Sequence, residues 1–423
     1  MLDVLAVWVC VVVAQVGPAA EGAPGAQAQR DGAEGFDLGR LQATPEFWVR
    51  PGYVVTRVAS DIEAARFMEF DDRGTLYVSS PGGTIVTLRD ENADGWYETR
   101  GAFVRNMQSV HGLHFHNGWM WFTTSGLVWK ARDRDGDGAH DDLQQVTDTG
   151  DMPQGGNHWW RSILVTDRHY YTGIGDSGNI SDESGTDRQK IFRFNLDGSG
   201  KTLFASGVRN TEKLRFRPGT EEIWGVDHGS DNFGVAYDER PGRRQPITDY
   251  NPPDEFNRYV EGGFYGHPFL TGLRVPRPEF AERPDIVDLA ARTIVPEWCF
   301  PAHAAANAFC FIEPELNART GAFPADHGGD AIVACRGSWN RTEKAGYEVV
   351  RVLFDRETGK PFGALTLVRT LSARGDILAR PVDCVQAPDG SVFFSCDHTK
   401  AVYRLRSAAP ASGAPAEPAA GGS

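Results

Sequence analysis

The 423-residue sequence contains no long segment with helical periodicity and no run of basic residues. Lysines and arginines are scattered, and the formal net charge is −14, which argues against a nucleic-acid partner. A hydrophobic content of 40% and a charged content of 24% are typical of a soluble globular protein. The length suffices for one large domain or for two ordinary ones.

Cysteine is scarce: the chain has six, and none lies in a Cys-x-x-Cys spacing. This excludes the usual thiolate zinc site and the attachment site of a c-type haem. Cys10 lies in the apolar leader, and five cysteines follow it: Cys299, Cys310, Cys335, Cys384 and Cys396. Because five is odd, at least one thiol stays free or bridges two chains. Buried thiols and one or two disulfides both remain open.

Long apolar runs are also rare, and the clearest one, MLDVLAVWVCVVVAQVG, begins the chain. It has signal-peptide length and is too short for a comfortable membrane span. We expect residues 1–28 to be a signal peptide, with an uncleaved anchor as the alternative, because no Lys or Arg stands at its start. Residues 29–44 read as a linker and 407–423 as a disordered Pro/Ala/Gly-rich tail. The expected location is secreted or periplasmic, without an integral membrane domain.

A short pattern recurs instead: an apolar strand, a turn with Asp, Asn or Gly, then a strand rich in aromatic and β-branched residues. Its six copies begin near residues 67, 111, 161, 212, 308 and 382. The early copies are about 45–50 residues apart, a spacing typical of four-stranded propeller blades. The sequence therefore predicts an all-β fold, a six-bladed β-propeller of four-stranded antiparallel blades over residues 45–406. A pair of β-sandwiches explains the repeat less well.

Two acidic loops share one spacing. DENADGWYE and DRDGDGAHD place oxygen-bearing side chains at positions 1, 3, 5 and 9 around a glycine turn, namely Asp90, Asn92, Asp94 and Glu98, and Asp133, Asp135, Asp137 and Asp141. Alternate carboxylates around such a turn can wrap one hard cation, so each loop is a candidate structural calcium site. The alternative is a solvated acidic turn.

Loops rich in Gly, His, Arg and Asn lie between the repeats, in the order GGNHWWR, YTGIGD, SGVRN, VDHGS, DEFN…GGFYG, RGSWNR…GYEVVRV and LARPVD. In this order they resemble the soluble aldose and sorbosone dehydrogenases that depend on pyrroloquinoline quinone, which are six-bladed propellers that oxidise sugars. The resemblance spans nearly the whole expected propeller. It implies pyrroloquinoline quinone and Ca²⁺ as cofactors, a sugar substrate and an external electron acceptor.

The resemblance assigns the catalytic roles to three positions. His158 matches the general base, and Asp176 matches the carboxylate that orients and charges that base. Arg209, with Asn210, matches the pair that binds the quinone and its reacting carbonyl. A histidine backed by a carboxylate is suited to removing a hydroxyl proton near neutral pH.

Further positions match cofactor, substrate and metal contacts of the family. The backbone oxygens of Gly229 and Ser230 fall where family carbonyls hold the cofactor's Ca²⁺. Arg336 and Arg380 fit cofactor-binding positions, and Phe300 falls where an aromatic lines the substrate side. Trp159 is a candidate to stack on a ring. Asp254 and Glu255 match structural calcium ligands.

The sequence also departs from the family pattern. Val382 stands where a second arginine is expected, and Ser230 replaces a proline. Two other functions therefore stay open: a non-catalytic propeller that binds a glycan or a protein, and a Ca²⁺-dependent hydrolase of the lactonase type. The hydrolase requires several Asn, Asp and Glu side chains converging on one channel metal, whereas the acidic loops here follow outer strands.

Overall fold

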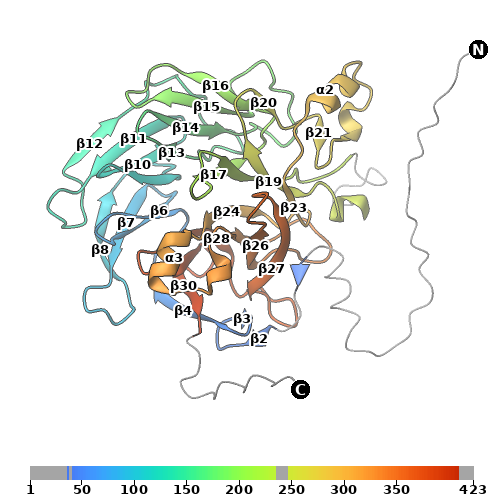
Figure 1. The fold of residues 1–423 in the computed structure, drawn as a ribbon. Helices are drawn as coiled ribbons and strands as arrows, with labels where there is room; N and C mark the ends of the chain where they lie inside the picture. Colours follow the sequence, from blue (N-terminus) through green and yellow to red (C-terminus); the bar gives the residue numbers. More distant parts are fainter. Residues whose placement is uncertain (1–35, 38–40, 235–245, 409–423) are drawn as a thin grey trace, which may run out of the picture.

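The computed structural model describes residues 36–37, 41–234 and 246–408. Six sheets stand around a central axis, and the colours in Figure 1 follow the chain from blade to blade. This confirms the predicted six-bladed β-propeller. The expected leader, most of the linker and nearly all of the expected tail lie outside the described residues.

The first three blades follow one another in sequence. Blade 1 consists of β5 (Met68–Phe70), β6 (Leu76–Ser80), β7 (Thr84–Arg89) and β8 (Glu98–Val104). Blade 2 consists of β9 (Leu113–His116), β10 (Trp119–Thr124), β11 (Leu127–Arg132) and β12 (Asp142–Gln145). Blade 3 consists of β13 (Leu164–Val165), β14 (His169–Ile174), β15 (Lys190–Asn195), β16 (Thr202–Ser206) and the added β20 (Gly263–Phe264), which is parallel to β16.

The last three blades draw on distant segments. Blade 4 consists of β17 (Thr211–Phe216), β18 (Ile223–Asp227), β19 (Asp254–Tyr259) and β23 (Trp298–Phe300). Blade 5 consists of β24 (Ala306–Phe311), β25 (Ala331–Cys335), β26 (Glu348–Phe354) and β27 (Pro361–Arg369), joined by β1 (Phe36–Asp37), β2 (Gln42–Ala43) and β3 (Trp48–Val49). Blade 6 consists of β28 (Pro381–Gln386), β29 (Val392–Cys396), β30 (Ala401–Ser407) and β4 (Tyr53–Ala59).

The smaller elements lie in connections. The segment between β19 and β23 carries β21 (Leu270–Thr271), β22 (Val275–Pro276), the 3₁₀ helix η3 (Pro278–Phe280) and the helix α2 (Ile286–Arg292). The others are η2 (Pro246–Asp249), α3 (Pro314–Thr320) and η4 (Ala325–His327). Because β20 pairs with β16, the long connection within blade 4 folds back onto blade 3.

The two ends of the propeller meet in blade 6. The early strand β4 forms its outermost strand and pairs with β30 from Tyr53–Ser407 to Ala59–Val402, as Figure 1 shows where blue meets red. Backbone hydrogen bonds thus close the ring.

The six sequence repeats form the two inner strands of each blade, and they are apolar because blades pack face to face. The buried apolar residues fall into six main clusters, each formed mainly by two neighbouring blades. Between blades 2 and 3, for example, the ring centroids of Trp121 and Tyr170 lie 5.7 Å apart. Every residue of β6 is buried, because both faces of that strand contact protein.

The five cysteines in the described residues are all free thiols, and four of them are buried. Of the two possibilities left open by the sequence, the structure has buried thiols. No helix in the described part of the chain is long and apolar enough to cross a membrane.

Candidate active site

A pocket of about 450 Å³ opens at one end of the central channel. Most of its lining residues lie in the loop just before the first strand of a blade or in the loop just after the second strand. The others lie at the beginning of a strand. In an up-and-down blade these positions share one end of the sheet, so segments of five blades that are distant in the sequence converge. The polar lining residues are Arg66, His158, Arg209, Asn210, Glu212, His228, Asp231, Asp254, His303, Asn307, Arg336, Asn340 and Asp397.

His158 is held by a backbone carbonyl. Its Nδ1 lies 2.9 Å from the carbonyl oxygen of Asp176. Because a carbonyl can only accept, Nδ1 carries the proton and Nε2 is left as the basic nitrogen. Burial, followed by the positive charge of Arg209, lowers the pKa of His158 to about 3. The imidazole is therefore neutral near pH 7, as a proton acceptor must be.

The Asp176 carboxylate does not contact His158, contrary to the expected role. It accepts hydrogen bonds from the backbone N–H groups of Gly178 (2.7 Å) and Ser181 (3.0 Å), and its Oδ2 lies 2.7 Å from Nε2 of His267. Burial raises the pKa of Asp176, but these bonds outweigh it and hold the pKa below its ordinary value. Asp176 thus supports His158 through the main chain, because its carboxylate fixes the loop whose carbonyl holds the imidazole.

A buried carboxylate shapes the loop that carries the predicted Arg–Asn pair. Asp227 accepts hydrogen bonds from the backbone N–H of Arg209 (2.9 Å) and of Asn210 (2.5 Å). The Arg209 guanidinium donates to the carbonyl (2.9 Å) and the side-chain oxygen (2.7 Å) of Asn179. The Asn210 amide nitrogen lies 3.0 Å from Nδ1 of His228. Both predicted residues line the pocket with His158.

Glu212 and Arg66 form a hub at the inner end of the pocket. Arg66 Nη2 lies 2.9 Å from Glu212 Oε2, and His111 Nε2 lies 3.2 Å from the same oxygen. The amide nitrogens of Asn210 (3.0 Å) and Asn307 (3.3 Å) donate to Glu212. Burial raises the pKa of Glu212, but Arg66 and the neighbouring groups hold it below its ordinary value.

Neither Glu212 nor Arg66 was predicted from the sequence. The motif SGVRN ends at Asn210. In extended chain, side chains two residues apart lie on the same face, so this alternation could have indicated that Glu212 lies beside Asn210. Arg66 had no comparable signal, since it precedes a strand without a surrounding motif. Its guanidinium lies 4.3 Å from the ring centroid of Trp160, a cation–π contact that no local pattern predicts.

The contacts of Glu212 argue against the alternative of a Ca²⁺-dependent hydrolase. A central metal would need carboxylate and amide oxygens free to converge on it. Here the carboxylate of Glu212 is bound by the guanidinium of Arg66, and the two asparagines direct amide nitrogens toward it. The inner end of the channel is therefore built around a side-chain cation.

The pocket rim is formed mainly by the segment after β25. Arg336 lines the pocket as predicted, and its Nε donates to Asp397 Oδ2 at 2.9 Å. Trp339 also lines the pocket and is 73% exposed. Asn340 donates to the carbonyl of Asp231, which ties this loop to the one after β18.

Three residues that were predicted to contact the cofactor or substrate through their side chains do not line this pocket. Trp159 lies against Trp160 with ring centroids 3.7 Å apart and an angle of 33° between the ring planes, and Trp160 is the one that lines the pocket. Phe300 is 1% exposed, in the core between blades 4 and 5. Arg380 donates to the carbonyl of Gly337 (3.2 Å) and to the Tyr347 hydroxyl (3.0 Å).

Of the two residues after β18 whose backbone oxygens were predicted to bind Ca²⁺, one lines the pocket and the other does not. Gly229 lines the pocket. Ser230 does not: it is 2% exposed and borders a smaller cavity, where Arg277 donates to its hydroxyl at 2.5 Å.

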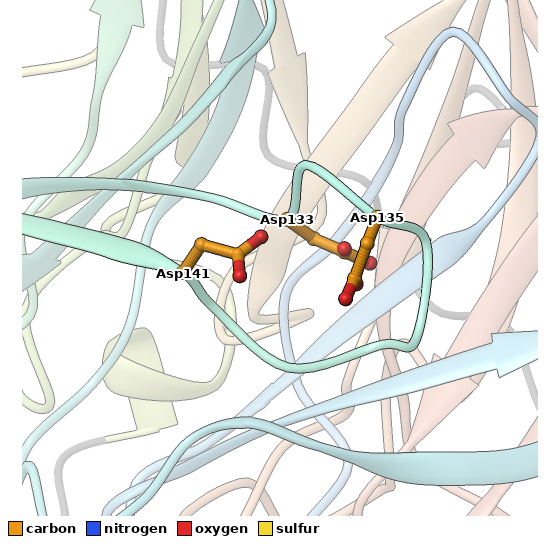
Figure 2. A group of neighbouring side chains, drawn as sticks. All are labelled: Asp133, Asp135 and Asp141. Carbon is orange, nitrogen blue, oxygen red and sulfur yellow. The ribbon is translucent and has the colours of Figure 1, made fainter.

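One of the two acidic loops gathers its carboxylates. In the loop between β11 and β12, one oxygen from each of Asp133, Asp135 and Asp141 lies within 4.8 Å of the others, and Figure 2 shows the three side chains within that loop. Asp137 is not part of the group; its carboxylate accepts the backbone N–H of Ala139 at 2.8 Å.

The other loop, between β7 and β8, does not bring Asp90, Asp94 and Glu98 together in this way within the described residues. Asp90 accepts the backbone N–H of Gly95 at 2.9 Å, and Asn92 accepts that of Asp94 at 2.9 Å. These bonds complete an acidic turn by themselves.

Asp254 and Glu255 are not gathered with a third His, Cys, Asp or Glu side chain among the described residues. They are adjacent on β19, so their side chains point to opposite faces of the strand. Asp254 accepts the backbone N–H of Gly229 (2.8 Å) and of Ala306 (3.0 Å), while Glu255 accepts that of Gly272 at 2.7 Å. Burial, followed by the charge of Asp227, raises the pKa of Glu255 to about 8.

Comparison with known proteins identifies a family. A family model described as a domain of unknown function, DUF7133, matches residues 41–262, more than half of the chain. The chain belongs to the DUF7133 family. A second model, TrAA12-like, matches residues 281–408 of this DUF7133 chain. A curated protein of Borreliella burgdorferi, described as uncharacterized, is 28% identical over 217 residues, 51% of either chain, so the match spans about half the length of that relative.

Solved structures share the propeller of this DUF7133 chain. A calcium structure of a Trichoderma reesei protein of carbohydrate-active enzyme family AA12 has a TM-score of 0.72 at 19% identity, covering 88% of this chain and 100% of that one. The holo PQQ domain of a Coprinopsis cinerea pyranose dehydrogenase has a TM-score of 0.69 at 19% identity, covering 86% and 98%. The soluble aldose sugar dehydrogenase of Escherichia coli has a TM-score of 0.59 at 15% identity, covering 84% and 99%. The chain therefore shares the fold of quinone-dependent sugar dehydrogenases and AA12 proteins.

Proposed function

We propose that this protein oxidises a hydroxyl group of a sugar or related polyol with pyrroloquinoline quinone bound in the channel pocket. The observation that carries the proposal is His158, a neutral imidazole whose Nδ1 is bound by a carbonyl and which lines a pocket with Arg209 and Asn210. A hydroxyl proton moves to Nε2 of His158. The quinone, when bound, supplies the acceptor for the hydride that leaves the alcohol carbon.

The pocket contains the types of side chain that would bind this cofactor. Arg66, Arg209 and Arg336 offer guanidinium groups to carboxylates, and the rings of Trp160 and Trp339 offer flat faces to a planar molecule. A volume of about 450 Å³ lies within the roughly 300–1,000 Å³ usual for small-molecule sites.

The charge of the pocket supports a proposed role for a divalent cation. Its three arginines face four carboxylates: Glu212, Asp231, Asp254 and Asp397. The lining alone is therefore not a positive site for a tricarboxylate. A Ca²⁺ ion bound together with the quinone would reverse that balance, so we expect quinone binding to require Ca²⁺.

His158 has a defined part in the reaction. Its neutral Nε2 takes the hydroxyl proton, and the Asp176 carbonyl keeps the imidazole in the required tautomer. Arg209, fixed by Asn179 and by Asp227, places a positive charge where negative charge develops on oxygen. Turnover would also require an external electron acceptor, to which the quinone would return the two electrons taken from the alcohol.

The proposal is tested by dye-linked oxidation of a panel of aldoses, with the protein loaded with quinone and Ca²⁺. We expect activity with at least one aldose and a fall in kcat of about 10²–10⁴-fold for His158→Gln. His169→Gln, which changes a histidine on β14 outside the pocket, serves as the matched control and should keep full activity. Equal activity of His158→Gln and the control would refute the role of His158.

A further inference from the structure

A second cavity, of about 380 Å³, lies against blade 3, away from the channel. It forms where the strand β20 pairs with β16 and brings the segment after it against the start of β15. One part of its wall is apolar, from Leu203, Phe264, Phe269 and Ile294. Ser184, Gln189 and Ser206 add polar groups to the wall.

The charged lining of this cavity has one sign. Arg188, Lys190 and Arg292 line it, and no Asp or Glu is among its described lining residues. The Lys190 ammonium donates to two backbone carbonyls, and Arg292 lies 4.9 Å from the ring centroid of Phe264. Neither of these two cations forms an ion pair with a carboxylate in the described chain. Arg188 Nε lies 3.8 Å from Glu183, and its other contacts are backbone carbonyls.

We propose that this cavity binds a small organic carboxylate that carries an apolar ring, at a site separate from the channel pocket. The carboxylate would accept hydrogen bonds from Lys190 and Arg292, neither of which has a carboxylate at ion-pair distance among the described residues. The ring would pack against Phe264 and Phe269. A purely inorganic anion would leave that apolar wall exposed to water, and a neutral ring would leave the cations unpaired.

His267 gives this site a reporter. It lines the cavity, and its Nε2 lies 2.7 Å from Asp176 Oδ2. His303 lines the channel pocket instead, where its Nε2 lies 2.6 Å from the carbonyl oxygen of Thr248. A ligand in the blade 3 cavity therefore contacts one histidine and not the other.

The probe is benzoate, with benzamide as its uncharged counterpart, added to the full chain without quinone and followed by calorimetry and by histidine-selective NMR. We expect benzoate to bind at least tenfold more tightly than benzamide and to shift the His267 signal while leaving that of His303 unchanged. Arg292→Gln and Lys190→Gln should each weaken binding about tenfold, the effect of losing one charge-assisted bond.

Two further variants serve as controls. Arg193→Gln removes a cation of β15 that already pairs with Glu261 at 3.1 Å outside the cavity, so it should bind benzoate normally. Arg336→Gln, which changes the channel pocket, should also bind normally. The proposal is overturned if Arg336→Gln abolishes binding and Arg292→Gln does not, if benzamide binds equally well, or if millimolar benzoate does not bind.

Discussion

At the scale of single residues, the orientation of His158 is the feature on which the proposed chemistry depends. A carbonyl holds its Nδ1, and burial together with Arg209 keeps the ring neutral. The carboxylate of Asp176 acts one step further away, by holding the loop that provides this carbonyl. The orientation of the proposed base is therefore fixed by a backbone carbonyl and not by a direct ion pair with Asp176.

This environment predicts an unusual pH profile. In the proposed reaction the neutral imidazole is the active form, and a pKa of about 3 keeps it neutral as the pH falls from 8 to 5. We expect kcat/KM for aldose oxidation to show no loss that is assignable to His158 over that range. A decline with a midpoint near 6.5, absent from the His158→Gln variant, would show that the imidazole has an ordinary pKa.

Trp339 is the residue whose exposure calls for a function. Its side chain is 73% exposed yet lines the pocket, a position suited to stacking on a sugar ring. Trp339→Ala should raise KM about 3–10-fold with little change in kcat. Trp96→Ala, which removes an exposed tryptophan outside the pocket, should leave KM unchanged in steady-state assays. An equal change in both variants would contradict the assignment.

At the scale of elements, the β11–β12 loop links two blades. Gly138 accepts a hydrogen bond from the Thr87 hydroxyl of blade 1 at 3.0 Å, and the Arg134 carbonyl accepts one from Arg73 at 3.0 Å. The carboxylate group of Asp133, Asp135 and Asp141 lies within this loop. An ion bound there would stabilise the contact between blades 1 and 2.

We therefore expect Ca²⁺ to stabilise the protein through this loop. At a concentration of 100 times Kd the gain is about 2.7 kcal/mol, which corresponds to a rise in Tm of a few degrees. Asp135→Asn should remove most of that gain in calorimetric scans, whereas Asp94→Asn in the β7–β8 loop should retain it. The reverse ranking would show that calcium binds at the other loop.

At the scale of the whole molecule, stability depends on closure of the ring. The main apolar clusters each span neighbouring blades, and β4 joins the first part of the chain to blade 6. Loss of one contact between blades therefore weakens the entire ring, which favours a single cooperative unfolding transition.

Val58 on β4 tests this cooperativity. It is fully buried between blades 6 and 1, so Val58→Ala should lower the free energy of unfolding by about 2 kcal/mol. Val54→Ala, on the same strand but only partly buried, should cost less than half as much. Urea unfolding followed by tryptophan fluorescence and by circular dichroism should give coincident curves for both variants. Two separated transitions would show that the blades unfold independently.

The sequence predicted the architecture because each blade repeats one pattern of apolar strands and polar turns, which packing between blades enforces. It also indicated His158, Arg209, Asn210 and Arg336, since each lies in a loop next to an inner strand. It could not predict that Trp160 lines the pocket and Trp159 does not. Trp160 contacts Arg66, which is distant in the sequence, and no local pattern reveals such a contact.

The most direct test of the central proposal is a titration of the purified apoprotein with pyrroloquinoline quinone, by absorbance and calorimetry, with Ca²⁺ or with a chelator. We predict saturable binding of one quinone per chain with Ca²⁺, a large loss of affinity with the chelator, and at least tenfold weaker binding by Arg336→Gln. Absence of quinone binding in the presence of Ca²⁺ would contradict it.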